Sequence, residues 1–423
     1  MFCPKCGTKL DDDARFCPSC GAQVGERDAA SGETVTQTTA TAPKNVRTKG
    51  RGALIAAVVG AVVVVGVVVF ALSHFMGGAT AAGADGMGNS VTNISICQGQ
   101  AVSAGGKDYF FDQNGLECAK VNDKESRQKL CTVPDDTSVG MLNYVDGRLL
   151  YVSFDSDAQK YEVKSVKDDG SDSENIYTLN QRTSSDEYNC DPCLSVVDGR
   201  VYLVYVSYGD ETDTDTMHVI SMKIDGSDEK EEANFSMNCH ANHQIAVSKD
   251  RVFFSNDDAD TMGGCDGVYV MKLDGSDKKK IFEANGGVVD HIAFVNDRVV
   301  IAASDCDDPH YTFSVWDYYV TTMKQDGSDA KKIVNSSEDW FEIIGANKGL
   351  VYLKSGEKYF SVPVAGGEKT ELKLPDSYER GVLVFGMDDH VVFLDGDTSD
   401  LSCNVGSAKA DGSDYVEYFT GED

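Results

Sequence analysis

The chain has 423 residues and a formal net charge of −31, with 69 Asp and Glu against 38 Lys and Arg. Such an excess of carboxylates repels nucleic acid and anionic surfaces, so the composition excludes a nucleic-acid partner. The charge is uneven along the chain, because the first 52 residues are nearly neutral and the acidic remainder is long enough to bury a large core.

The first predicted element is a metal-binding head made of two Cys-x2-Cys knuckles. Cys3 and Cys6 form the first knuckle, Cys17 and Cys20 form the second, and a glycine follows each. Four thiolates around a tetrahedral ion make a closed structural zinc site. We therefore expect one structural Zn²⁺ per chain in a head that covers residues 1–24. Disulfides and a rubredoxin-type iron site are the alternatives, and a reducing compartment argues against the first.

The head resembles the short zinc-ribbon domains found at the N-termini of many bacterial membrane proteins. The resemblance covers roughly residues 1–24, and both cysteine knuckles match. It implies a docking or regulatory module with an unknown cytosolic partner. A catalytic role is disfavoured, because protein thiolates fill all four zinc positions.

A run of about twenty apolar residues, Ala53 to Leu72, predicts a transmembrane helix over residues 53–74. At about 1.5 Å of rise per residue, the run spans about 30 Å, the thickness of a bilayer core. The positive-inside rule places the N-terminus in the cytosol and the C-terminal body outside. That rule rests on four basic residues just before the run: Lys44, Arg47, Lys49 and Arg51.

The segments that flank the apolar run are predicted to be linkers. Residues 25–52 form a flexible basic linker, and residues 75–94 form a linker rich in Gly and Ala. A signal peptide cleaved near Ala79 to Ala81 is the alternative, but the run is too long for a signal h-region. We therefore expect a single-pass protein of the cell membrane that contacts lipid through one helix.

The body, residues 95–423, is built from repeats. A turn of sequence Asp-Gly-Ser-Asp recurs at 169–172, 225–228, 274–277, 326–329 and 411–414. A second turn, such as Asp146-Gly147 or Asp198-Gly199, alternates with it. Asp followed by Gly suits a hairpin, because glycine adopts positive φ without a Cβ clash. The second turn recurs at a spacing of roughly 40 to 52 residues, which divides the body into seven units of four short strands, A to D.

Four-stranded units at this period are typical of a β-propeller. We expect an all-β fold whose ectodomain is a seven-bladed propeller, with six or eight blades as the alternatives, plus one transmembrane helix and a small zinc ribbon. The units resemble an uncharacterised bacterial propeller family related to low-density-lipoprotein-receptor-type and TolB-like propellers. Stretches such as Arg251 to Asn256 and Met271 to Ser276 carry this resemblance, although the receptor-type Tyr-Trp-Thr-Asp motif is absent.

The two faces of such a propeller differ in this sequence. A–B and C–D turns share one face and are uniform, whereas B–C and D–A loops share the other and are varied and acidic. Binding residues lie disproportionately on loops held by a rigid scaffold. We therefore expect a ligand face that includes the following residues: Asp257, Asp258, Asp305, Asp307, Asp395, Asp397, His240 and His243. Clustered carboxylates can also hold Ca²⁺, but none of these loops has an EF-hand spacing, so solvated loops are favoured.

The body contains nine cysteines, and several of them should pair outside the cell. Cys118 and Cys131 lie at equal distances from a turn predicted between Lys124 and Glu125. If that turn has two loop residues, the cysteines face each other at a spacing that permits a disulfide.

These features predict a membrane-anchored protein of the cell surface that binds or senses an unknown extracellular protein, peptide or glycan, and the two resemblances imply a bacterial source. The propeller would be the scaffold, and the zinc ribbon would be the docking module. One alternative is a cell-envelope enzyme acting on carbohydrate, since propeller enzymes assemble carboxylate pairs from distant blades. The other is a passive structural protein of the envelope. No Gly-x-Ser-x-Gly or His-Glu-x-x-His motif occurs, which favours a binding role over an enzyme.

Overall fold

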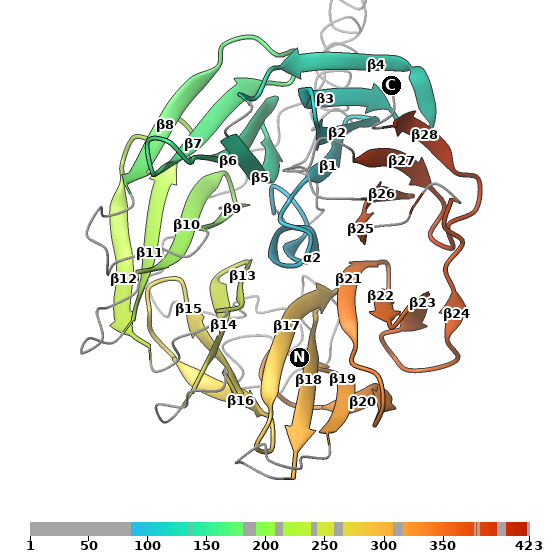
Figure 1. Ribbon diagram of the computed structural model, residues 1–423. Coiled ribbons are helices and arrows are strands. Elements are labelled where there is room, and N and C mark those ends of the chain that lie inside the picture. Colours follow the sequence, from blue (N-terminus) through green and yellow to red (C-terminus); the bar gives the residue numbers. More distant parts are fainter. Residues whose placement is uncertain are drawn as a thin grey trace, which may run out of the picture. The chain divides into compact units, whose positions relative to one another are not determined.

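The structure is a computed structural model, and the part of the chain it describes belongs to the unit Phe70–Asp423 (Figure 1). It describes residues 86–134, 137–180, 192–207, 215–237, 243–257, 265–307, 316–375, 378, 381–395 and 403–420. The predicted zinc ribbon, basic linker and transmembrane helix lie outside these residues. Within the described ranges, no helix is long and apolar enough to cross a membrane.

The strands form antiparallel sheets in chain order. The first sheet contains β1 (Ala101–Ala104), β2 (Lys107–Asp112), β3 (Gly115–Lys120) and β4 (Asp123–Cys131). The second contains β5 (Thr137–Val145), β6 (Arg148–Asp155), β7 (Lys160–Lys167) and β8 (Glu174–Asn180). The third contains β9 (Cys193–Val197), β10 (Arg200–Ser207), β11 (Thr216–Lys223) and β12 (Lys230–Ser236).

The remaining strands continue this order. The next sheet contains β13 (Ile245–Ser248), β14 (Arg251–Asn256), β15 (Gly267–Lys272) and β16 (Lys279–Glu283). It is followed by β17 (Val288–Val295), β18 (Arg298–Cys306), β19 (Trp316–Lys324) and β20 (Lys331–Ser336). The last, eight-stranded sheet contains β21 (Glu342–Asn347), β22 (Leu350–Ser355), β23 (Lys358–Pro363), β24 (Thr370–Glu371), β25 (Val382–Gly386), β26 (Val391–Asp395), β27 (Asn404–Ala408) and β28 (Val416–Phe419).

The eight-stranded sheet consists of two antiparallel runs of four strands. One parallel residue pair, Gly345 with Val384, joins β21 to β25 and so connects the runs. We call each antiparallel run of four strands a blade. The blades stand around the short helix α2 (Val91–Ser95), and the earliest strand of each blade lies nearest to it (Figure 1).

Burial explains the strand sequences. The central strand β26 reads Val-Val-Phe-Leu-Asp and is buried throughout, because neighbouring blades cover both of its faces. The outer strand β4 begins Asp-Lys-Glu and is largely exposed. Apolar side chains between adjacent blades form the core. Burial of each large aliphatic or aromatic side chain stabilises the fold by about 1.5–3 kcal/mol. One such cluster joins Phe385 and Val392 to Ala101 and Phe110, and so closes the ring. This all-β architecture is a β-propeller, as predicted.

The Asp-Gly-Ser-Asp turns have one repeated geometry. In the turn at 225–228, the Asp225 carboxylate accepts hydrogen bonds from the Ser227 backbone N–H at 2.9 Å and the Ser227 hydroxyl at 2.6 Å. Gly226 has φ +76°, and Asp228 has φ +57°. The predicted positive φ of the turn glycines is therefore confirmed, at Gly170, Gly226, Gly275, Gly327 and Gly412.

These turns also contact the preceding blade. A Cβ at Gly226 would lie 2.2 Å from the carbonyl oxygen of Ile176, which belongs to the outer strand of the blade before it. Gly170 and Gly412 approach the backbones of Leu130 and Lys373 in the same way. The turn is therefore both a hairpin and a spacer between blades.

The predicted bridge between Cys118 and Cys131 is wrong, because both are free thiols in the structure. The turn between β3 and β4 comes earlier than predicted, since Lys120 pairs with Asp123. Irregularities in the ladder shift the register further. As a result, Cys118 pairs with Gln128, and Cys131 lies across from Leu116.

Candidate functional site

The centre of the ring is filled by the N-terminal end of the described chain. We call residues 86–100 the plug; it contains α2, which starts at the N-cap Ser90. Asn93 and Ile94 are 0% and 2% exposed. The predicted linker over residues 75–94 therefore ends too late, because residues from Gly86 onward belong to the packed unit.

Side chains of the plug bond the free inner edges of the blades. The Thr92 hydroxyl donates to the Phe294 carbonyl at 2.6 Å and accepts from the Phe294 N–H at 2.8 Å. The Asn93 amide donates to the Gly386 carbonyl at 3.1 Å and accepts from the Gly386 N–H at 3.0 Å. An inner strand edge would otherwise leave backbone groups without partners in a buried place. Side chains of the plug thus make the hydrogen bonds that a neighbouring strand would otherwise make to the inner strands.

The plug enters from one end of the blades. The Asp198 N–H donates to the Gly86 carbonyl at 2.9 Å, and Asp198 lies in the turn between β9 and β10. We call the end of the blades that carries the A–B and C–D turns the turn face. The opposite end, with the B–C and D–A connections, is the loop face.

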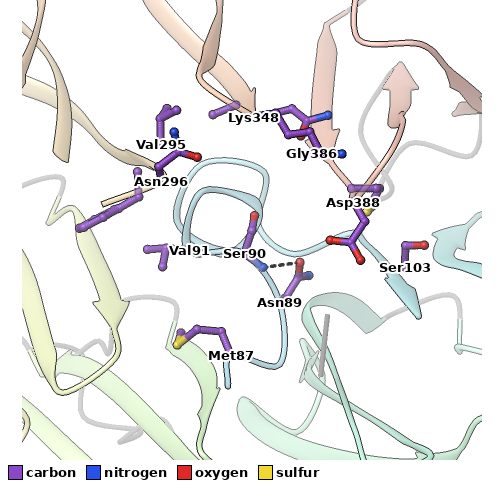
Figure 2. Close-up of a pocket in the computed structure, with 14 residues that line it drawn as sticks. Met87, Asn89, Ser90, Val91, Ser103, Val295, Asn296, Lys348, Gly386 and Asp388 are labelled. Atoms are coloured by element: carbon purple, nitrogen blue, oxygen red, sulfur yellow. Dashed lines mark hydrogen bonds between the residues drawn. The ribbon is translucent and has the colours of Figure 1, made fainter. Parts of the chain in front are cut away.

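A cavity of about 360 Å³ opens beside the plug on the turn face (Figure 2). Its lining comes from the plug, from the end of β1 and from the turns that follow β17, β21 and β25. Apolar groups include Met87, Val91 and Phe294. Polar and charged groups include Asn89, Ser90, Asn296, Lys348 and Asp388. A mixed lining with few charges is typical of small-ligand sites.

The charged groups of the cavity stand on turns with fixed backbones. Lys348 and Asp388 are both exposed, and they follow the neighbouring inner strands β21 and β25. Lys348 and Asn296 have φ values of +42° and +57°. The cavity therefore offers one cation and one carboxylate above an apolar and amide-lined floor.

The described members of the predicted ligand face mostly bond the protein itself. Asp257 is 1% exposed and accepts from the Asp266 N–H at 2.6 Å. Asp395 is 3% exposed and accepts from the Gly381 N–H at 3.1 Å. Asp305 accepts from the Asn285 N–H at 3.0 Å and from the Tyr319 hydroxyl at 2.7 Å. These three carboxylates fix loop backbones at the ends of the B strands.

The other predicted members differ among themselves. His243 pairs with the buried Asp215 at 3.3 Å, whereas Asp307 is exposed. Asp258, Asp397 and His240 lie outside the described residues, as do the zinc ligands Cys3, Cys6, Cys17 and Cys20. In the ranges that the structure describes, no group of three or more His, Cys, Asp or Glu side chains could hold a metal ion.

Two half-buried acids, Asp266 and Asp290, have raised pKa values. Burial, together with the neighbouring Asp257, raises the pKa of Asp266 to about 6. Burial alone raises the pKa of Asp290 to about 6. Both shifts favour the neutral carboxyl over the charged carboxylate.

Sequence reasoning missed the plug and the cavity. The available signal was Ser90 followed by Asn93, an N-cap pattern, with apolar Val91 and Ile94 at helical spacing. That signal is one turn long and lies in a segment that was assigned to a linker for its Gly and Ala content. The cavity itself joins residues far apart in sequence, so no local pattern marks it.

One protein family matches part of the chain. The zinc-ribbon domain family matches residues 2–24. No curated protein matches the chain.

Several solved structures are similar to this chain at low sequence identity. Puromycin hydrolase is 11% identical, with 76% of this chain and 53% of that chain covered and a TM-score of 0.51. The β-propeller domain of the Trilobed protease from Pyrococcus furiosus is 12% identical, covering 77% and 94%, with a TM-score of 0.45. TolB from Acinetobacter baumannii is 11% identical, covering 72% and 74%, with a TM-score of 0.38. This chain spans about half the length of puromycin hydrolase.

Proposed function

We propose that the protein is a membrane-anchored binding protein of the cell surface, with the propeller outside as the ligand-binding scaffold. The apolar run at 53–74 and the basic residues before it support the anchor and its orientation. We also propose that the ring has seven blades, counting the eight-stranded sheet as two blades joined at one parallel pair.

In this proposal the head is a cytosolic docking module. Cys3, Cys6, Cys17 and Cys20 would hold one structural Zn²⁺, and the match of residues 2–24 to the zinc-ribbon family supports that donor set. A head this small cannot build a core, so metal binding would supply its folding free energy. Its partner would be another cytosolic protein.

The cavity on the turn face is the observation that carries the binding role. Its volume of about 360 Å³ lies within the roughly 300–1,000 Å³ range of small-ligand sites. Lys348 and Asp388 present opposite charges over a rigid floor, so a free amino acid or the end of a peptide chain would match them. Predicted loop-face residues that lie outside the description stay candidates for a larger ligand.

A thermal-shift screen of the full-length protein in detergent micelles tests the cavity. The panel contains amino acids, short peptides and oligosaccharides, and a ligand at a hundred times its Kd stabilises the fold by about 2.7 kcal/mol. Lys348→Asn and Asp388→Asn should each weaken binding at least tenfold, because a hydrogen bond to a charged group contributes about 1.5–3 kcal/mol. Asparagine suits the positive φ of Lys348.

Asp146→Asn is the matched control, since it neutralises an exposed turn-face residue with φ +49° that does not line the cavity. It should bind every hit as the wild type does. Absence of any stabilising compound, or hits that bind both cavity variants normally, would refute the site. Protease added to intact cells separately tests the anchor and should digest the propeller while sparing the head.

A further inference from the structure

A surface on the loop face is built around one exposed tryptophan. Among the described residues, Trp340 is the large apolar side chain that stands out in solvent, with 53% exposure. It lies between β20 and β21, where the Glu338 and Asp339 N–H groups donate to the Ser336 hydroxyl at 3.1 and 3.0 Å. The next residue, Phe341, is 3% exposed in the core. The backbone on both sides of Trp340 is therefore fixed, and its indole is presented outward.

The second tryptophan of the chain lies at the same end of the same blade. Trp316 begins β19 and stacks on Tyr318, with ring centroids 6.2 Å apart and planes at 13°. Tyr318 pairs with Ser336, so the start of β19 and the loop carrying Trp340 share one end of the β17–β20 blade. The sequence contains 2 tryptophans, and both are here.

Two acidic residues precede Trp340 in the same loop. Glu338 and Asp339 are exposed, and within the described part of the chain neither carboxylate has an ion-pair partner. Elsewhere in the same blade, an aromatic ring and two carboxylates surround a lysine ammonium. The Lys332 ammonium lies 3.4 Å from the centroid of the Tyr319 ring and 3.4 and 3.3 Å from carboxylate oxygens of Asp305 and Asp317.

We propose that Glu338, Asp339 and Trp340 form a docking surface for an arginine-bearing segment of a partner protein. A guanidinium group stacks on an indole face and donates paired hydrogen bonds to a carboxylate, which matches an exposed tryptophan beside two free acids. The acidic body would draw such a segment in, because complementary charge speeds association. The surface lies on the loop face, so it is separate from the turn-face cavity and does not depend on that proposal.

Intrinsic fluorescence of the full-length protein in detergent micelles reports this surface directly, since both tryptophans are at one end of one blade. A short arginine-rich peptide should produce a saturable change, its lysine counterpart a weaker one, and its glutamine counterpart none. Anisotropy of a dye-labelled arginine peptide then gives the affinity of each variant. Trp340→Ala should weaken binding about tenfold, and Trp340→Phe should retain part of it, since a phenyl ring still offers a π face.

Neutralisation variants distinguish docking from general attraction to an acidic protein. Glu338→Gln with Asp339→Asn should weaken binding at least tenfold, whereas Asp146→Asn with Asp198→Asn removes the same charge on the turn face and should change it less than twofold. Equal effects of the two pairs, or unchanged affinity in Trp340→Ala, would overturn the proposal. A fluorescence response to oligosaccharides but not to the arginine peptide would overturn it in favour of a glycan. Unfolding midpoints of all variants confirm that they are folded.

Discussion

At the residue scale, burial sets the charge state of two neighbours on β17. Burial raises the pKa of the Asp290 carboxyl to about 6 and lowers the pKa of His291 to about 4. The neutral His291 ring accepts a hydrogen bond at Nδ1 from the Ile343 N–H at 3.3 Å. Between about pH 4 and pH 6 both side chains are therefore neutral when the chain is folded, whereas both are charged when it is unfolded.

The two groups have opposite effects on stability across that window. The folded state holds a proton on Asp290 that the unfolded state has lost, so stability falls as pH rises. The unfolded state holds a proton on His291 that the folded state lacks, so stability rises with pH. Asp290→Asn should remove the first contribution, stabilise the protein by about 1 kcal/mol at neutral pH and leave a curve that rises with pH.

Denaturant unfolding of the full-length protein in detergent micelles at several pH values measures this change. Asp297→Asn, in the exposed turn after β17, is the control and should keep the wild-type curve. A variant at Asp290 that is less stable than the wild type at neutral pH would show that its carboxylate has a favourable partner instead.

The partners of individual carboxylates could not be predicted from the sequence. An aspartate at the end of a B strand predicts a polar loop, and Asp257, Asp305 and Asp395 stand at the ends of β14, β18 and β26. Whether such a carboxylate faces a ligand or bonds a nearby backbone N–H depends on the loop path, which sequence does not encode locally. Those three residues bond the backbone.

At the scale of the element, the hairpins were the most predictable part of the fold. The Asp-Gly pairs marked the turns and their positive φ, and the apolar runs between them marked the strands. The β3–β4 turn, which lacks that pair, was misplaced, and the error moved Cys118 out of register with Cys131. The contact of each Asp-Gly-Ser-Asp turn with the preceding blade was not predictable, because it joins two separate units.

Two glycine substitutions separate the free-energy cost of placing alanine at positive φ from the cost of a clash with the preceding blade. Gly226 and Gly199 have φ values of +76° and +74°, but only Gly226 has backbone within reach of a new Cβ, whereas Gly199 has nothing within 4 Å. Gly199→Ala should lower the free energy of unfolding by about 1–2 kcal/mol, because alanine is strained at positive φ. Gly226→Ala should cost about 2 kcal/mol more, because the blades must move apart.

Unfolding midpoints of the two variants, measured side by side, give the difference. Equal destabilisation would mean that the blades absorb the extra methyl group without strain. In that case the turn would act only as a hairpin.

At the scale of the whole propeller, the β1–β4 and β25–β28 blades meet without exchanging a strand. A buried polar group joins them instead. The His390 Nε2 lies 2.8 Å from Asp108, its Nδ1 lies 2.7 Å from Asp389, and the Tyr418 hydroxyl donates to Asp108 at 2.7 Å. Sequence could predict that the ring closes but not how, because Asp108 and His390 lie 282 positions apart.

The contact between these two blades should contribute less stability as pH rises above neutral. Burial alone would lower the pKa of His390, but hydrogen bonds and charges from Asp108 and Asp389 outweigh it and raise the pKa. A raised histidine pKa gives stability that is complete below the ordinary value of about 6.5 and lost as pH rises through the folded value. His390→Ala should destabilise the protein by about 3 kcal/mol near pH 6, because it leaves Asp108 buried without its cation.

Denaturant unfolding at about pH 6 and about pH 9 tests this prediction. The difference in free energy of unfolding between the wild type and His390→Ala should be smaller at the higher pH. His218→Ala is the control, since its partner Glu231 is 46% exposed and such pairs contribute less than about 1 kcal/mol. A gap that stays constant with pH would mean that His390 contributes through packing and not through its charge.

The plug gives the propeller an order of assembly. It is the earliest part of the described chain to be synthesised, yet Thr92 bonds a residue 202 positions later and Asn93 bonds one 293 positions later. A nascent chain that stops before β25 therefore leaves the amide of Asn93 without the strand edge it was placed to bond. The ribosome must therefore synthesise nearly the whole body before α2 can complete its hydrogen bonds, so the plug reaches its final contacts in the same late stage that completes the ring.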